Sequence, residues 1–140
     1  MTRCASYEPE WSRAREALRA AETLTREHCY ADAISRAYYA ILHAAKAALH
    51  IHDVSVANHA AVRRMFGLHL VRSGEIEPEW SAYLIESLDD RLAADYDVET
   101  DFSKKDAKDE CGRSREFLSR IRRYLLRKGL KDRELRKKQN

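Results

Sequence analysis

The sequence predicts an all-α protein, and two observations support that fold class. The chain has only 4 Gly and 2 Pro among 140 residues, so it offers few positions for the tight turns of β-hairpins. Its most frequent residues are Ala, Arg, Leu and Glu, which are strong helix formers. With 44% hydrophobic residues, a single domain of this length can bury its own core.

The first two helices are expected over residues 9–26 and 30–50. Pro9 suits the first turn of the earlier helix. The apolar residues of that helix recur at intervals of three or four: Trp11, Ala14, Leu18, Ala21 and Leu24. The break near residues 28–30 is short, which favours an antiparallel hairpin.

The third and fourth helices are expected over residues 59–73 and 78–97. Asn58 is a suitable N-cap for the third helix, Gly74 ends it, and Pro78 begins the fourth. The apolar face of the third helix consists of Val62, Met65, Phe66 and Leu70. The predicted buried set of the fourth helix consists of Trp80, Leu84, Ile85, Leu88 and Leu92.

A fifth helix is expected after Ser103, which together with Asp106 resembles a capping box. Gly129 is the natural end of this helix. Its predicted buried residues are Ala107, Cys111, Ser114, Phe117, Leu118, Ile121 and Leu125. We therefore expect one helical domain over residues 1–128 and a basic C-terminal tail over residues 129–140.

The C-terminal end is a separate electrostatic feature. Residues 120–140 hold ten Lys or Arg against Asp132 and Glu134, a local charge of +8 in a chain whose net charge is +3. Such a segment attracts RNA phosphates or an acidic groove of a partner protein. The alternative is a solvated helix end without a partner.

The composition also indicates where in the cell the protein is expected. No apolar run reaches the length of a signal peptide or a membrane span, so we expect a soluble, cytoplasmic protein without a membrane partner. Cys4, Cys29 and Cys111 are widely spaced and fit reduced thiols. His50 and His52 have no further ligand pair at zinc spacing, so we predict no metal site and no cofactor.

The second helix carries two lines of side chains. Residues seven apart lie two turns apart on nearly the same face, so Arg36, Tyr39 and His43 form a polar line. An apolar line beside it consists of Ile34, Ala37, Tyr38, Ile41, Ala45 and Ala48. The small residues that flank the polar line allow another helix or subunit to approach closely: Ala40, Ala44 and Ala47.

The segment 35–49, SRAYYAILHAAKAAL, resembles the signature of small prokaryotic HEPN-domain proteins. Three further stretches extend the resemblance over residues 8–126: NHAA at 58–61, FGLHLVRSG at 66–74 and RLAADYD at 91–97. The resemblance implies an up-and-down bundle of four to five helices that commonly forms a homodimer. Many similar proteins are metal-independent endoribonucleases and act as toxins beside a minimal nucleotidyltransferase antitoxin.

The resemblance makes Arg36 and His43 the candidate catalytic residues, since six residues separate them and the family motif is Arg-x(4 to 6)-His. Histidine titrates near neutral pH and can transfer a proton, while arginine binds phosphate. Two copies of this line in a homodimer would bring two such sets into one cleft. The structural alternative is that Arg36 pairs with Asp95 or another carboxylate and that His43 is a satisfied core or interface histidine.

Five further residues are candidates for binding RNA or a nucleotide: Tyr39, His59, Arg91, Asp95 and Tyr96. Each has a structural alternative. Arg91 and Asp95 form an (i, i+4) pair that, with Tyr96, can lock a helix end. His59 lies at a helix N-terminus, which suits an anion but also suits capping alone. Tyr39 can stack on a base or pack in the core.

These observations leave three functions open. The first is a HEPN toxin or effector that acts on RNA, as a metal-independent endoribonuclease of a toxin-antitoxin module. The second is a non-catalytic nucleotide-binding or adaptor module that partners a minimal nucleotidyltransferase. The third is a structural dimer with no affinity for RNA or nucleotides.

Overall fold

The computed structural model describes residues 7–96, 98–99 and 101–129. Over these residues it contains helices and no strand, which confirms the all-α class. The helices are α1 (Tyr7–Arg26), α2 (Tyr30–His50), α3 (His59–Phe66), the π-helical segment η2 (Gly67–Val71), α4 (Glu79–Tyr96) and α5 (Lys104–Arg127). The predicted basic tail lies outside the described residues from position 130 onward. No helix in the described part of the chain is long and apolar enough to cross a membrane.

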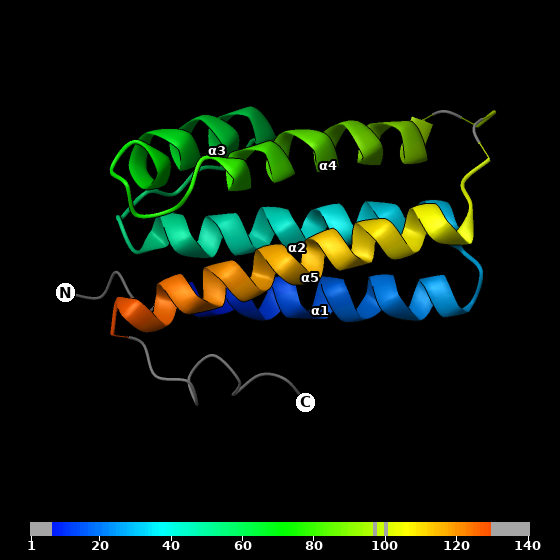
Figure 1. Cartoon of the computed structure of the whole chain (residues 1–140), viewed down its shortest axis with the longest axis horizontal. Coiled ribbons are helices and arrows are strands. Elements are labelled where there is room, and N and C mark those ends of the chain that lie inside the picture. The colour runs from blue at the N-terminus through cyan, green and yellow to red at the C-terminus, as the bar shows by residue number, and fades with distance from the viewer. Residues whose placement is uncertain (1–6, 97, 100, 130–140) are drawn as a thin grey trace.

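Helix α2 is the centre of the bundle. It packs against α1, α3, α4 and α5, and Figure 1 shows it between the α3–α4 layer and the α1–α5 layer. All six residues of its predicted apolar line are at most 2% exposed. Ala40, Ala44 and Ala47 are 0% exposed within the single chain. They therefore allow close approach of helices of the same chain, and the alternative of a subunit contact at these three alanines is wrong.

The predicted third helix is divided in two. After Phe66 the backbone widens into a π-turn, in which the Arg72 amide donates to the Gly67 carbonyl at 2.9 Å. The segment nevertheless keeps its apolar side chains inward, since Val62, Phe66 and Leu70 are each 0% exposed. Gly74, at φ +84°, then lies in the turn that ends this helical segment, as predicted, in a conformation that glycine adopts without strain.

The buried set predicted for α4 is confirmed only in part. Only Leu84 is buried, at 3% exposure, while Ile85 and Leu92 are 46% and 40% exposed. Trp80 and Leu88 are partly buried. Helix α4 lies in an outer layer (Figure 1), and its inward face includes Trp80, Leu84 and Leu88 but not Ile85 or Leu92.

Helix α5 agrees with its prediction. Ser103 and Asp106 form the expected capping box, with the Asp106 amide donating to the Ser103 hydroxyl at 3.1 Å and the Ser103 amide donating to the Asp106 carboxylate at 3.0 Å. All seven residues of its predicted core set are buried. The apolar period did not reveal the polar residues that are also buried on this helix: Glu110, Arg120 and Tyr124.

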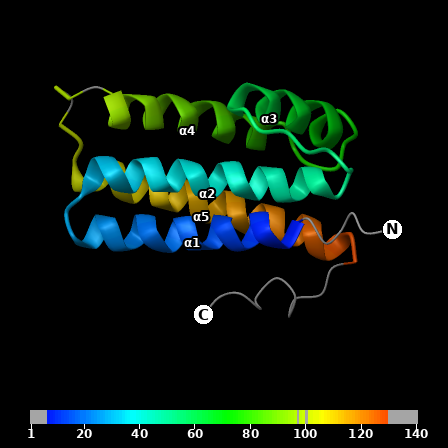
Figure 2. The same cartoon turned by 180° about the vertical axis from the view of Figure 1, so that it is seen from behind.

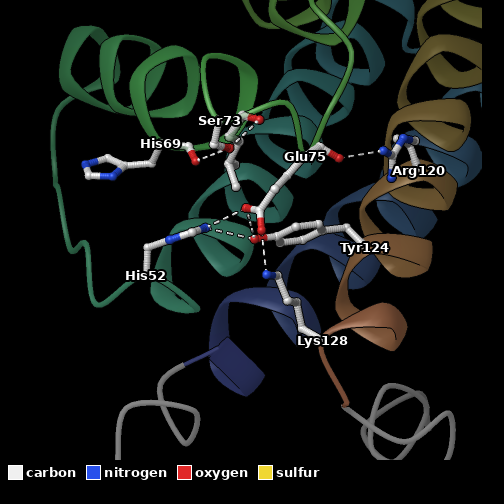
Figure 3. Close-up of polar contacts among 8 residues, drawn as sticks. His52, His69, Ser73, Glu75, Arg120, Tyr124 and Lys128 are labelled. Carbon is white, nitrogen blue, oxygen red and sulfur yellow. Dashed lines mark hydrogen bonds and ion pairs between the residues drawn. The ribbon is translucent and has the colours of Figure 1, made fainter.

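A polar network holds the turn after η2 against the C-terminal end of α5 (Figure 3). The Tyr124 hydroxyl donates to Glu75 at 3.0 Å, and His52 Nε2 lies 2.9 Å from the same hydroxyl. Lys128 also donates to the Glu75 carboxylate. Arg120 donates to the Glu75 carbonyl oxygen at 3.0 Å. These contacts fix the end of the bundle at which residues 51–58 and 72–78 connect the helices.

Buried Glu110 makes the stability of the fold depend on pH. Its carboxylate lies 3.1 Å from Arg113, which also contacts Asp90 at 3.3 Å. Burial and the neighbouring Asp90 raise the pKa of Glu110 above its ordinary value of 4.5, although Arg113 acts in the opposite direction. A raised pKa means that the folded chain holds this proton more tightly than the unfolded chain does.

We expect the Tm of the wild-type chain to fall, relative to that of the Glu110→Gln variant, as the pH rises above 4.5. The stability due to the protonated carboxyl is complete below the unfolded pKa and is lost through the folded pKa. Thermal unfolding followed by circular dichroism from mildly acidic to mildly alkaline pH measures this difference. Parallel curves of Tm against pH for the two proteins over the whole range would contradict the raised pKa of Glu110.

Candidate functional site

The ring of Tyr39 is the centre of a polar cluster to which α2, α3 and α4 contribute. The guanidinium carbons of Arg36 and Arg91 lie 5.2 and 5.3 Å from the ring centroid. The imidazole rings of His43 and His59 lie 6.4 and 6.5 Å from it. Residues predicted from three separate parts of the sequence therefore come together around one aromatic ring.

Helix α1 adds a residue that the sequence did not reveal. Glu10 Oε1 lies 2.7 Å from His43 Nδ1, so the carboxylate orients the imidazole through that nitrogen. The Glu10 carboxylate also lies 3.6 Å from Lys46 and 3.9 Å from His50. The two partners are 33 positions apart, and no local spacing indicates such a contact.

Glu10 is ionised at neutral pH. Burial alone would raise its pKa, but the hydrogen bond to His43 and the charge of Lys46 outweigh burial and leave the pKa below its ordinary value. An ionised carboxylate stabilises positive charge that forms on the histidine ring during proton transfer. The pair thus has the arrangement of an oriented acid-base histidine.

A small pocket opens between α1 and α2 beside this pair. It has a volume of about 170 Å³. Its lining consists of Arg13, Ala17, Arg36, Tyr39 and His43. The side chain of His43 is 20% exposed, so a bound group can reach it from solvent. The two arginines give the pocket a positive charge suited to a phosphate.

Arg91 and Asp95 pair as the sequence predicted. Arg91 Nε lies 2.9 Å from Asp95 Oδ2, and Arg91 Nη2 donates to the Tyr39 hydroxyl at 2.9 Å. The side chain of Arg91 is only 14% exposed. Asp95 therefore pairs with Arg91, and the alternative in which Asp95 holds Arg36 is wrong. Arg36 is exposed and lies over the ring of Tyr39.

His59 reaches the cluster from the first turn of α3. Asn58 caps that helix as predicted, because its side chain accepts a hydrogen bond from the Ala61 amide at 2.8 Å. Burial, and then the positive charge of Arg91, lower the pKa of His59 below its ordinary value of 6.5. The imidazole of His59 is consequently neutral at pH 7 and can accept a proton.

Two further tyrosines, Tyr96 and Tyr38, have different environments from that of Tyr39. Tyr96 is 72% exposed at the end of α4, and the contacts described for the ring of Tyr39 do not include it. Tyr38 is 2% exposed, and burial raises its pKa to about 12. Tyr38 therefore belongs to the core, as the apolar line of α2 predicted. Among the described residues, no three His, Cys, Asp or Glu side chains converge to hold a metal ion.

Comparison with known proteins identifies the family to which this helical bundle is similar. The model of the HEPN domain family matches residues 7–124. A protein named "Putative toxin MJ0605" from Methanocaldococcus jannaschii is 37% identical over 112 residues, which are 80% of this chain and 83% of that protein. A second protein of that organism, "Putative toxin MJ0142", is 29% identical over 84% of this chain and 80% of its own length. The "UPF0332 protein glr0978" from Gloeobacter violaceus is 30% identical over 81% and 90% of the two chains. The chain therefore belongs to the HEPN domain family.

Proposed function

We propose that this HEPN protein is a toxin-type effector that cleaves RNA without a metal ion. The observation that carries the proposal is the gathering of two imidazoles and two guanidiniums around Tyr39, with one imidazole held by Glu10. We name this cluster the Tyr39 site. It consists of Glu10, Arg36, Tyr39, His43, His59 and Arg91.

The size of the pocket favours a polynucleotide over a free nucleotide. A volume of about 170 Å³ is smaller than the roughly 300–1,000 Å³ of sites that enclose small molecules. One phosphodiester group fits beside Arg36 and His43, while the bases on either side stay outside the pocket. A chain of nucleotides that crosses the surface meets this requirement.

The proposed reaction needs a base, an acid and positive charge at the phosphorus. His59, neutral at pH 7, takes the proton from the 2′-hydroxyl, whose oxygen attacks the phosphorus. His43, oriented by Glu10, gives a proton to the leaving 5′-oxygen as the bond from phosphorus to that oxygen breaks. Arg36 neutralises the charge that builds on the phosphoryl oxygens. The products are a 2′,3′-cyclic phosphate and a 5′-hydroxyl.

Both proton-transfer groups come from one chain. From the sequence we expected a homodimer to bring two sets of Arg36 and His43 into one cleft. His59 and Arg91 supply a second imidazole and guanidinium around the same ring. A homodimer is part of the proposal as a means of presenting two such sites, and cleavage does not require one subunit to complete the other.

The names of the two archaeal relatives support the toxin role. A toxin that cleaves RNA needs a neutralising partner, and the family resemblance makes a minimal nucleotidyltransferase the proposed antitoxin. We place this pair in the cytoplasm, where its RNA substrates are found.

The Arg36→Ala variant tests the proposal. We expect the wild-type chain to cleave a mixed RNA pool in excess chelator and the variant to lose most of that activity, because the pocket loses the guanidinium beside His43. Arg64→Ala is the matched control, since Arg64 is an exposed arginine of α3 away from the pocket. Nucleotide or partner binding without any cleavage by the wild type would instead support a non-catalytic nucleotide-binding or adaptor module.

A further inference from the structure

Arg91 contacts both tyrosine rings against which the imidazole of His59 lies. Its guanidinium carbon is 5.3 Å from the centroid of the Tyr39 ring and 5.8 Å from that of the Tyr38 ring. The imidazole of His59 lies 6.5 Å from the first ring, almost perpendicular to it at 86°, and 5.4 Å from the second. Figure 2 shows α3 and α4, which carry His59 and Arg91, in one layer over α2, which carries the two tyrosines. One guanidinium and one imidazole therefore share the same pair of rings.

The two rings are held in different ways. Tyr38 is 2% exposed, so the close packing of the core fixes its ring. Tyr39 is only partly buried, and its hydroxyl accepts a hydrogen bond from Arg91 Nη2 at 2.9 Å. The other arginine over this ring, Arg36, is exposed, and exposed side chains change rotamer readily. Because a hydrogen bond is directional, Arg91 determines the position of the hydroxyl and, with it, of the Tyr39 ring.

Asp95 fixes Arg91 in turn. Asp95 lies one helical turn further along α4, and its Oδ2 is 2.9 Å from Arg91 Nε. A guanidinium is a rigid planar fork, so one partner at Nε and another at Nη2 together determine its plane. Residues four apart share one face of a helix, and this ion pair is therefore set by α4 itself. The connection from Asp95 through Arg91 to Tyr39 exists before any RNA is bound.

The environment of Arg91 suits positioning better than contact with a phosphate. Two nitrogens of its fork already have partners, Asp95 and Tyr39. Its side chain is only 14% exposed. Arg36 lines the pocket beside His43, whereas Arg91 does not. Arg91 is thus placed to act on the imidazole of the neighbouring histidine through a tyrosine ring.

We propose that Arg91 is a positioning residue of the Tyr39 site. Held by Asp95, it fixes the ring of Tyr39, and that ring holds the imidazole of His59 in the place where it takes up a proton. The part that this arrangement plays in catalysis rests on the proposed function, in which His59 is the base. Arg91 itself touches neither the reacting phosphate nor the attacking hydroxyl.

The charge of Arg91 favours the same outcome as its geometry. Burial is the main cause that lowers the pKa of His59, and the positive charges of Arg91, Lys46 and His43 lower it further. Helix α4 carries the first of these charges and α2 carries the other two. A neutral imidazole is the form that accepts a proton, so Arg91 both places the base and keeps it ready.

A double-mutant cycle in kcat tests whether Arg91 acts through Tyr39. We expect Arg91→Gln to lower kcat for RNA by up to about 10²-fold, the loss that a small misplacement of a reacting group causes, with KM unchanged. Tyr39→Phe keeps the ring but removes the hydroxyl, and it should also lower kcat. The double variant should be no slower than Arg91→Gln, because one hydrogen bond is lost only once. Each protein is measured at its own pH optimum, and Arg64→Gln, which removes an exposed arginine of α3, should keep the wild-type kcat.

Nuclear magnetic resonance of the chain without RNA measures position and charge independently of cleavage. We expect cross-relaxation between the ring protons of Tyr39 and His59 in the wild type and weaker cross-relaxation in Arg91→Gln. The titration of His59 should move to higher pH in Arg91→Gln, because a positive charge that lowers its pKa is removed. Tyr39→Phe should leave that titration in place, since Asp95 still holds the guanidinium. The His59→Ala spectrum identifies the signals of this histidine.

Three results would overturn the inference. They are a wild-type kcat in folded Arg91→Gln, additive losses in the double variant, and a loss that appears only in KM, which would make Arg91 a direct contact of the RNA. Circular dichroism verifies folding, and Asp95→Asn replaces Arg91→Gln in the cycle if the latter does not fold. A wild-type chain that leaves RNA intact would contradict the proposed function. The weakened cross-relaxation in Arg91→Gln would then still support the positioning of His59 by Arg91.

Discussion

Replacing His43 by alanine is expected to lower the rate of RNA cleavage by about 10² to 10⁴, the usual contribution of a positioned acid-base group. The expected loss is large because Glu10 holds His43 at 2.7 Å beside the arginines of the pocket. His59 belongs to the Tyr39 site but does not line the pocket, so it does not replace His43 as the acid. Initial rates on a fixed RNA in excess chelator, at saturating concentration, measure the change in kcat.

Two companion variants separate chemistry from folding. His69→Ala removes a histidine of η2 that lies outside the pocket and should retain the wild-type rate. Glu10→Gln keeps the shape of the side chain but removes its negative charge beside His43, so its rate should fall less than that of His43→Ala. A folded His43→Ala protein with the wild-type rate would exclude the proposed role of this histidine.

The Glu77→Ala substitution is expected to cause the largest loss of stability among exposed positions. Arg120 is 5% exposed, donates to Glu77 Oε1 at 2.8 Å, and hydrogen-bonds the Glu75 carbonyl (Figure 3). Without Glu77, the buried guanidinium lacks its carboxylate, which we expect to lower the free energy of unfolding by about 2–3 kcal/mol. This is less than for a fully buried pair, because the side chain of Glu77 is 55% exposed and water can enter.

Urea unfolding of two further variants tests this explanation. Glu16→Ala removes a glutamate whose side chain is 68% exposed, and should change the free energy of unfolding by less than about 1 kcal/mol. Glu77→Ala/Arg120→Met removes the stranded charge and should recover much of the loss. Equal stability of Glu77→Ala and Glu16→Ala would show that the pair contributes nothing beyond an ordinary surface contact.

The same pair gives stability a dependence on acid. The hydrogen bond from Arg120 is the main reason that the pKa of Glu77 falls from 4.5 to about 2. A depressed pKa contributes stability above the unfolded value, and that contribution is lost as the pH falls from 4.5 towards 2. The difference between the wild type and Glu77→Ala should therefore shrink over that interval.

The helices were predictable because local rules determine them. The capping box at Ser103, the N-cap Asn58 and the glycine at position 74 each act within a few residues of the helix end that they define. The core face of α2 followed from its apolar period, since that helix is covered on most sides. The family resemblance then supplied the up-and-down arrangement.

The errors arose where tertiary packing decides burial. The apolar residues of α4 suggested an inward stripe, yet Ile85 and Leu92 face outward because that helix is covered on one side only. A π-turn at Gly67 is a change of hydrogen-bond register, and the residue sequence of η2 carries no clear signal for it. Buried polar residues of α5 such as Arg120 look like surface residues until their distant partners are known.

In the candidate site too, the residues that share one helix were predictable, and the contacts between helices were not. Arg36, Tyr39 and His43 share one helix and were visible as a line. Their connection to Glu10 and His59 depends on how α1 and α3 pack on α2, at separations of 33 residues and more than 15 residues. The motif thus identified part of the Tyr39 site, and the fold added the carboxylate and joined the second imidazole to it.

Metal-independent cleavage is tested most directly by mapping the ends of the RNA fragments that the wild-type chain produces in excess chelator. We expect 2′,3′-cyclic phosphate and 5′-hydroxyl ends, and loss of cleavage at a mapped position when the 2′-hydroxyl there is methylated. Fragments with 3′-hydroxyl and 5′-phosphate ends, or cleavage that survives this methylation, would contradict it.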